Sequence, residues 1–166
     1  RGIYVMDRGG DRMKLFNPLL DRKLRFIIRL VGDRNLLWRG GERLAKDIGR
    51  DCAMQYAETV IKEDLETEQR FALEYGMRAV KLPGRDEQLY LVVVRGFGED
   101  PLLLLTNVAV QPSRKAVWAI VQGYIARWLV EETIRFIKQS YHLEDMRVLH
   151  YERLRKERAR LQVAAI

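Results

Sequence analysis

Residues 122–138 read QGYIARWLVEETIRFIK, and this stretch decides how the fold is interpreted. It holds one glycine and no proline, so we expect it to lie inside a long helix that Ser113 caps and that ends near Tyr141. On a helical wheel, at about 100° per residue, one side of the stretch is apolar and is predicted to pack on a core. The residues of this side are Ile125, Ala126, Leu129, Val130, Ile134, Phe136 and Ile137.

The other side of this predicted helix combines a carboxylate with cations and aromatic rings. The residues within an arc of roughly 60°, or at its edge, are Tyr124, Arg127, Glu131, Lys138, Trp128 and Arg135. Arginine and lysine neutralise phosphates, tyrosine hydrogen-bonds phosphate oxygens, and aromatic rings stack on unpaired bases. A carboxylate repels a phosphodiester unless a divalent cation such as Mg²⁺ or Mn²⁺ neutralises both. The pattern therefore predicts a DNA-facing side on which Glu131 binds a metal.

Ion pairing on a solvated helix explains the same spacing equally well. Glu131 is four residues from both Arg127 and Arg135, and surface pairs with this separation contribute about 0.3–0.5 kcal/mol each. Glu132 lies about 100° round the helix from Glu131, and it is the weaker candidate for a metal ligand. The spacing alone leaves both interpretations open.

The order of apolar patterns along the chain indicates a mixed α and β domain. Ile3–Met6 is predicted to be a strand, and Asp11 is expected to cap a helix that follows it. Residues 44–67 carry no clear periodicity, and a second helix is expected over Leu143–Leu161. The other predicted strands are Leu24–Val31, Asn35–Arg39, Phe71–Tyr75, Arg78–Leu82 after a break at Gly76, Gln88–Val94 and Leu102–Val108.

Composition and charge narrow the functional classes. The 166 residues carry a formal net charge of +7, which favours a polyanionic partner such as nucleic acid. Cys52 is the single cysteine, so an internal disulfide is excluded, and we expect its side chain to be buried. Trp38 and Trp118 are expected in the core. No apolar run approaches the roughly 20 residues of a membrane helix and no signal peptide is visible, so we expect a cytoplasmic protein without membrane contact.

Three segments resemble DDE transposases of the bacterial insertion-sequence class that moves through DNA hairpin intermediates. The spacing of Tyr124, Arg127, Glu131 and Lys138 matches the Y-R-E-K signature of that class, within a string, YIARWLVEE, similar to its Tyr-x-x-Arg-Trp-x-x-Glu-Glu. The string YVMDRGGD at 4–11 resembles the strand that ends in the second catalytic Asp of the family. LLLTN at 103–107 resembles the strand shortly before the family's Glu helix, so the resemblance covers about residues 3–138.

The resemblance implies an α/β (α+β) architecture, namely a partial ribonuclease-H-like domain with a β-rich insertion, followed by long C-terminal helices. Residues 1–34 would belong to the core and about 35–110 to the insertion. Residues 113–141 would form the helix of the catalytic Glu, and 143–163 a basic C-terminal helix.

The resemblance also implies metal-dependent cleavage and strand transfer of DNA in cut-and-paste transposition. Asp7 and Glu131 would be the second and third acidic residues of a D-D-E triad that binds two Mg²⁺ or Mn²⁺ ions. Trp128 would lie beside an unstacked base, and a homodimer would hold two DNA ends together. The residues expected to contact DNA at the terminal inverted repeats are Tyr124, Arg127, Trp128, Arg135 and Lys138.

The first Asp of the triad is expected upstream of Arg1, since the chain opens directly on a strand and is expected to be a fragment. The fragment is then expected to be inactive by itself. Two other interpretations remain open: a non-catalytic DNA-binding module of the same fold, and a basic interaction scaffold unrelated to DNA. For Asp7, the local sequence also suggests a turn-forming role before Gly9 and Gly10.

Overall fold

A computed structural model describes residues 2–64, 67–108, 111 and 113–140, with the backbone alone for several positions in 62–69 and 128–140. The predicted helix over Leu143–Leu161 lies outside the described residues. The chain divides into two compact units, with the boundary between Arg127 and Trp128. No helix within the described part of the chain is long and apolar enough to cross a membrane.

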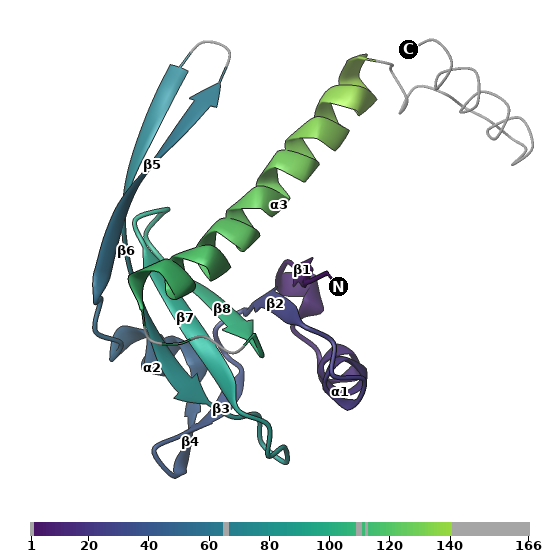
Figure 1. Ribbon diagram of the computed structural model, residues 1–166, viewed down its shortest axis with the longest axis vertical. Coiled ribbons are helices and arrows are strands. Elements are labelled where there is room, and N and C mark those ends of the chain that lie inside the picture. Colours follow the sequence, from purple (N-terminus) through teal and green to yellow (C-terminus); the bar gives the residue numbers. More distant parts are fainter. Residues whose placement is uncertain (1, 65–66, 109–110, 112, 141–166) are drawn as a thin grey trace, which may run out of the picture. The chain divides into compact units, whose positions relative to one another are not determined.

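A six-stranded sheet organises the first unit, in the order β1-β2-β8-β7-β6-β5 (Figure 1). β1 and β2 are parallel, and the other neighbouring pairs are antiparallel. The strands are β1 (Tyr4–Met6), β2 (Phe26–Arg29), β5 (Tyr56–Asp64), β6 (Thr67–Val80), β7 (Leu89–Arg95) and β8 (Leu102–Thr106). A separate two-stranded sheet consists of β3 (Asn35–Trp38) and β4 (Gly41–Leu44).

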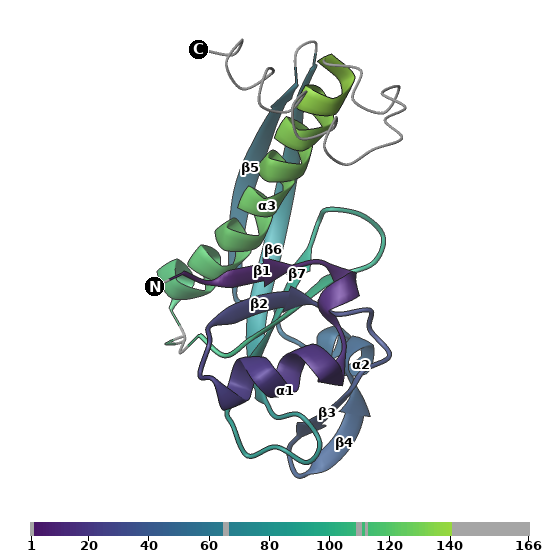
Figure 2. The same ribbon diagram turned by 90° about the vertical axis from the view of Figure 1, so that its right-hand side faces the viewer.

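Within the described residues, four helical elements accompany these strands, which confirms the predicted mixed class. They are the 3-10 turn η1 (Arg8–Gly10), α1 (Met13–Asp21), α2 (Ala45–Arg50) and α3 (Arg114–Ser140). Parallel strands need a crossover between them, and α1 makes this connection between β1 and β2 (Figure 2).

Helices cover both faces of the sheet because its central strands are apolar on both sides. α1 and α2 share one buried cluster with Ile28 and Leu103. The next residue along β2, Ile27, points to the opposite face, where α3 packs. Gly123 of α3 comes so close that a Cβ there would stand 3.1 Å from Cδ1 of Ile27. Each fully buried aliphatic side chain in these layers stabilises the fold by about 1.5–3 kcal/mol.

α3 packs on the sheet with the side that carries Tyr124. Its buried residues follow the three- and four-residue spacing of a helix stripe, and they are Val117, Ile120, Val121 and Tyr124. On the side predicted to face a core, Val130, Ile134 and Ile137 are 58%, 49% and 42% exposed. The prediction that this side packs on a core is therefore wrong. The apolar residues of the first two turns set the orientation of the helix, and they precede residues 122–138, from which the orientation was inferred.

The strands agree with the sequence pattern except around Gly76. A break was predicted there, but β6 continues through it, with Gly76 paired to Val93 of β7. Glycine is required at this position because a Cβ would collide with the carbonyl oxygen of Ala53. Most of the stretch 44–67, in which the sequence shows no clear periodicity, forms α2 and β5.

The predictions for Cys52 and the two tryptophans can also be compared with the structure. Cys52 is buried, as predicted, with 4% of its surface exposed, and burial raises the pKa of its thiol. Trp38 is partly buried against the core, and the ring of Trp118 lies 5.4 Å from that of Tyr75.

Asn107, just after β8, holds the beginning of β2. Its Oδ1 accepts a hydrogen bond from the backbone N–H of Phe26 at 2.9 Å, and its Nδ2 donates to the carbonyl of Leu24 at 2.8 Å. The side chain of Asn107 thus supplies two hydrogen bonds in place of a backbone pair, at the point where β2 and β8 separate. Both partners belong to backbone that would otherwise lack a hydrogen bond at this edge of the core.

Replacing Asn107 by Asp tests this bridge. Aspartate cannot donate to Leu24 and places a charge against its carbonyl, so we expect a loss of about 1–3 kcal/mol in the free energy of unfolding, measured with urea. Asn17→Asp, an exposed change on α1, should alter it by less than about 0.5 kcal/mol. Equal stabilities of the two variants would show that the bridge contributes nothing.

Candidate functional site

Asp7 follows directly on β1, at the carboxyl end of a strand that pairs in parallel with β2. The residue is exposed, and its Oδ1 accepts a hydrogen bond from the backbone N–H of Gly9 at 2.8 Å. The turn-forming role suggested by the local sequence is therefore present. A carboxylate has about four lone-pair sites, so this single bond leaves Asp7 able to bind an ion as well.

Close packing fixes the turn after Asp7. Gly10 is buried, and a Cβ on it would stand 2.8 Å from Cβ of Met6 and 3.2 Å from Cγ2 of Ile28. Its backbone N–H donates to the carbonyl of Asp7 at 2.9 Å. Glycine thus lets the turn lie directly on the ends of β1 and β2.

Asp11 does not cap α1, which corrects the sequence prediction. The residue before α1 is Arg12, and it makes no side-chain capping bond. The Asp11 carboxylate accepts instead from the backbone N–H of Val31, at 2.9 Å, and from Nε of Arg34. Long-range partners after β2 therefore replace the local bond that the spacing suggested.

The guanidinium of Arg12, which the sequence analysis did not single out, lies beside the same turn. Its Nη2 is 4.0 Å from the point where a Cβ of Gly9 would stand, and Oδ1 of Asp7 is 3.0 Å from that point. Carboxylate and cation thus flank the space that Gly9 leaves open. The sequence does hold a signal that could have pointed to Arg12, because this cation lies only five residues after Asp7 and close to the end of a strand.

α3 crosses the sheet next to the strand that ends in Asp7. Val5 of β1 pairs with Ile27 of β2, and Gly123 packs on Ile27 from above the sheet face. Of the predicted DNA-contacting residues, Tyr124 is fully buried and Arg127 is half-buried, with its guanidinium carbon 5.6 Å from the centre of the Tyr124 ring.

The remaining predicted site residues belong to the second unit. Their backbone is helical within α3, and their side chains lie outside the described residues. They are Trp128, Glu131, Glu132, Arg135 and Lys138. Whether Glu131 binds a metal therefore stays a prediction.

Metal binding at Asp7 agrees with the chemistry of its carboxylate. Mg²⁺ and Mn²⁺ prefer oxygen ligands, and an exposed Asp at a strand end offers them. Among the side chains that the structure describes, no three His, Cys, Asp or Glu residues lie close enough together to hold an ion. Asp7 thus fits as one ligand of a site that needs further carboxylates.

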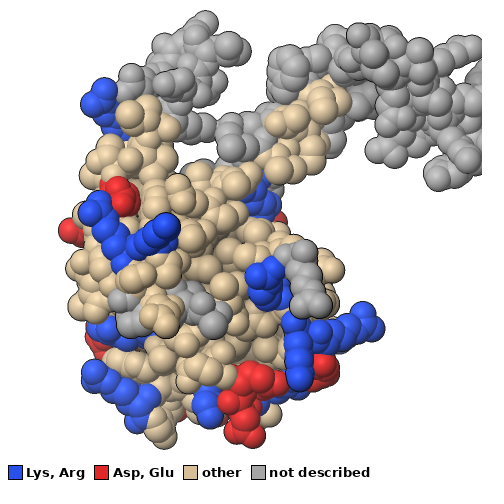
Figure 3. All heavy atoms as spheres, in the orientation of Figure 1, with Lys and Arg blue, Asp and Glu red and all other residues tan. Residues whose placement is uncertain are grey.

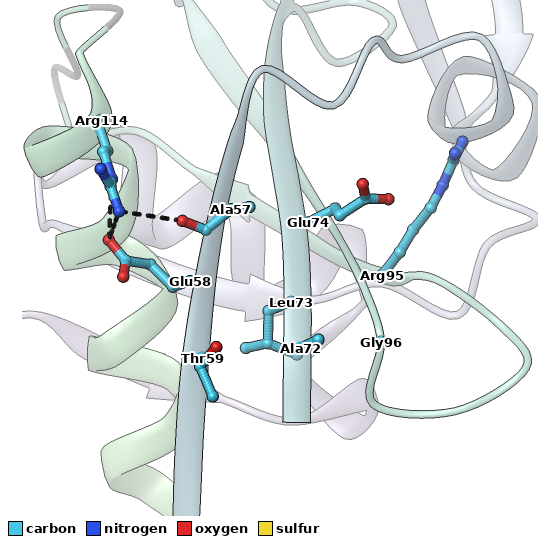
Figure 4. A pocket seen from close by; sticks show the side chains of 9 residues that line it. All are labelled: Ala57, Glu58, Thr59, Ala72, Leu73, Glu74, Arg95, Gly96 and Arg114. Atoms are coloured by element: carbon cyan, nitrogen blue, oxygen red, sulfur yellow. Dashed lines mark hydrogen bonds and ion pairs between the residues drawn. The ribbon is translucent and has the colours of Figure 1, made fainter. Parts of the chain in front are cut away.

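A cavity of about 500 Å³ lies at the opposite edge of the sheet from β1 (Figure 4). There Arg114, the first residue of α3, donates to Oε1 of Glu58 at 3.0 Å and to the carbonyl of Ala57 at 3.2 Å. Burial raises the pKa of Tyr75, and the nearby guanidinium of Arg114 opposes this rise. These contacts bind the beginning of α3 to β5 and β6, which makes the cavity an anchoring point of the helix.

On the face shown in Figure 3, the described Lys and Arg residues lie along both flanks, with Asp and Glu residues among them. The described basic side chains of this face are therefore interspersed with acidic ones rather than gathered in one patch.

Replacing Gly10 by Ala tests the packing of the turn. The added methyl group must displace Met6 or the turn, so we expect a loss of about 1–3 kcal/mol in the free energy of unfolding, measured by urea denaturation. Gly98→Ala is the matched control, since nothing lies within 4 Å of a Cβ at that position. An unchanged stability of Gly10→Ala would contradict the close contact.

Comparison with known protein families shows the family of this chain. A family model described as a transposase DDE domain matches residues 1–166. A search of curated protein sequences gives no match. The match extends over the whole sequence, so the chain belongs to the family of transposase DDE domains.

Proposed function

We propose that this chain supplies two acidic residues, Asp7 and Glu131, to the metal-dependent catalytic centre of a DNA transposase of the bacterial insertion-sequence class. The observation that carries the proposal is the position of Asp7 at the carboxyl end of β1, beside β2. Gly123 of α3 packs on Ile27 of β2, the strand that pairs with β1. Membership of the transposase family supports the same reaction class.

In this mechanism the carboxylates of Asp7 and Glu131 would be two of the ligands that hold two Mg²⁺ or Mn²⁺ ions. When bound, such ions activate an attacking hydroxyl and stabilise the leaving oxygen of the phosphodiester. The turn from Asp7 to Asp11 keeps the first carboxylate in place without the metal. Arg12, beside Gly9, is positioned to contact a phosphate oxygen of the bound DNA.

α3 would contribute the other DNA contacts. Arg127, Arg135 and Lys138 are proposed to neutralise phosphates at the terminal inverted repeats, and Trp128 to lie beside an unstacked base. Tyr124 is proposed to act through packing, because its ring is buried and lies under the guanidinium of Arg127. A homodimer would bring two transposon ends together.

Cleavage is proposed for a protein that supplies the complete D-D-E triad. Two carboxylates bind a pair of divalent ions poorly because they leave each ion with too few protein oxygen ligands to displace its waters. The 166 residues alone are therefore expected to cleave no DNA.

Two substitutions test the catalytic assignment in a transposase that carries the complete triad. Asp7→Asn and Glu131→Gln should each lower the rate of Mg²⁺-dependent cleavage of labelled transposon ends by more than about 100-fold, because each removes a metal ligand. DNA affinity, measured by fluorescence anisotropy, should fall by less than about threefold, since phosphate contacts supply most of it. Glu132→Gln, at the neighbouring helix position, is the matched control and should retain cleavage.

The same experiment separates the alternatives. Cleavage at the normal rate by Asp7→Asn or Glu131→Gln would contradict the catalytic role. Isothermal titration with Mn²⁺ that shows no binding dependent on either residue would favour a non-catalytic DNA-binding module. DNA binding without a steep dependence on salt, unchanged in an Arg127→Ala, Lys138→Ala double variant, would favour an interaction scaffold instead.

A further inference from the structure

We propose that the buried pair of Asp11 and Arg34 is a positioning element for Asp7, which sets how tightly the Asp7 carboxylate binds a divalent ion. The inference rests on the proposed metal-binding role of Asp7. Neither residue of the pair is proposed to touch the metal or the DNA. Their effect is transmitted through the short turn between Asp7 and Asp11.

The surroundings of Asp11 are unusual for a carboxylate in a surface turn. Its side chain is 2% exposed, and that of Arg34 is 17% exposed. Oδ2 accepts from the N–H of Val31 at 2.9 Å, Oδ1 accepts from Nε of Arg34, and Nη2 of Arg34 donates to the Asp11 carbonyl at 3.0 Å. All three bonds join the turn after β1 to the segment after β2.

Arg34 is itself held in place from the side of α1. Its guanidinium carbon lies 5.1 Å from the centre of the Phe16 ring, which is fully buried and packs on Phe26. A cation over an aromatic face is attracted by the ring, the more so where water is excluded. Arg34 therefore has a fixed position from which to hold Asp11.

A continuous set of backbone bonds leads from Asp11 back to Asp7. The N–H of Asp11 donates to the carbonyl of Arg8 at 3.1 Å, and that of Gly10 donates to the carbonyl of Asp7 at 2.9 Å. The N–H of Gly9 then donates to the Asp7 carboxylate itself, at 2.8 Å. A movement of Asp11 therefore changes the bond that orients the proposed ligand.

Groups that orient a metal ligand from behind affect the metal affinity strongly. Loss of such a group typically weakens binding by about 10–100-fold. Asp11→Asn keeps the shape of the side chain, but the amide cannot accept from both Val31 and Arg34, because one of its two ends is a donor. Arg34→Lys keeps the charge and loses the forked geometry, so it should restore part of the function that Arg34→Met removes.

Another ion pair provides a matched control. Arg85 donates to Asp21, the last residue of α1, at 2.8 Å, and the Asp21 side chain is 60% exposed. Asp21→Asn removes a carboxylate from an Asp–Arg pair, as Asp11→Asn does. Asp21 lies at the opposite end of α1 from the turn that holds Asp7.

The test measures Mn²⁺ binding and turn mobility in the transposase that carries the complete triad. Bound and free Mn²⁺ are separated by electron paramagnetic resonance, and hydrogen exchange of residues 7–12 is followed by mass spectrometry. Both are measured at a temperature where circular dichroism shows each variant folded. We expect Asp11→Asn and Arg34→Met to raise the Mn²⁺ dissociation constant by about 10-fold and to accelerate exchange, Arg34→Lys to have a smaller effect, and Asp21→Asn to have none.

The outcomes distinguish this inference from the proposed function. If folded Asp11→Asn binds Mn²⁺ within about twofold of the unchanged protein, while Asp7→Asn abolishes binding, the positioning role is overturned and the metal site stands. If Asp7→Asn also leaves Mn²⁺ binding unchanged, both proposals are overturned. Should Asp11→Asn fail to fold, the comparison of Arg34→Lys with Arg34→Met decides, and equal affinities in those two would overturn the positioning role.

Discussion

The contact between Gly123 and Ile27 is the constraint on which the arrangement around the candidate site depends. It brings the backbone of α3 directly onto β2, the strand that pairs with the Asp7 strand. The buried stripe from Val117 to Tyr124 then determines which side of the helix meets the sheet. Helix packing thus fixes the orientation of the first part of α3 beside the turn that holds Asp7.

Much of the fold could be predicted because the strands carry simple local signals. The apolar runs gave the strands that became β1, β2, β7 and β8, and Ser113 does accept a hydrogen bond from the N–H of Ala116 at the beginning of α3. The break predicted at Gly76 was wrong because glycine is needed there for a tertiary contact, namely the close approach of the Ala53 carbonyl, and not to end a strand. The strand after α2 was missed because it is an edge strand whose charged and apolar residues alternate imperfectly.

The candidate site was predictable only where the signal is local. Asp7 was identified from a strand end and a motif. The role of Asp11 was predicted wrongly because its partner, Arg34, lies 23 residues away in the sequence, and no local spacing reveals such a pair. The burial of Tyr124 was missed for a related reason, since a wheel drawn over residues 122–138 excludes the turns that orient the helix.

The turn after β1 and the beginning of α3 are held by different kinds of contact. Asp7 is held by a five-residue turn with bonds to its own backbone. The beginning of α3 is held by tertiary contacts, because its first residue, Arg114, is bound to Glu58 of β5 and Trp118 packs on Tyr75 of β6. β5 and β6, which lie toward the opposite edge of the sheet from β1, therefore help to fix where α3 begins.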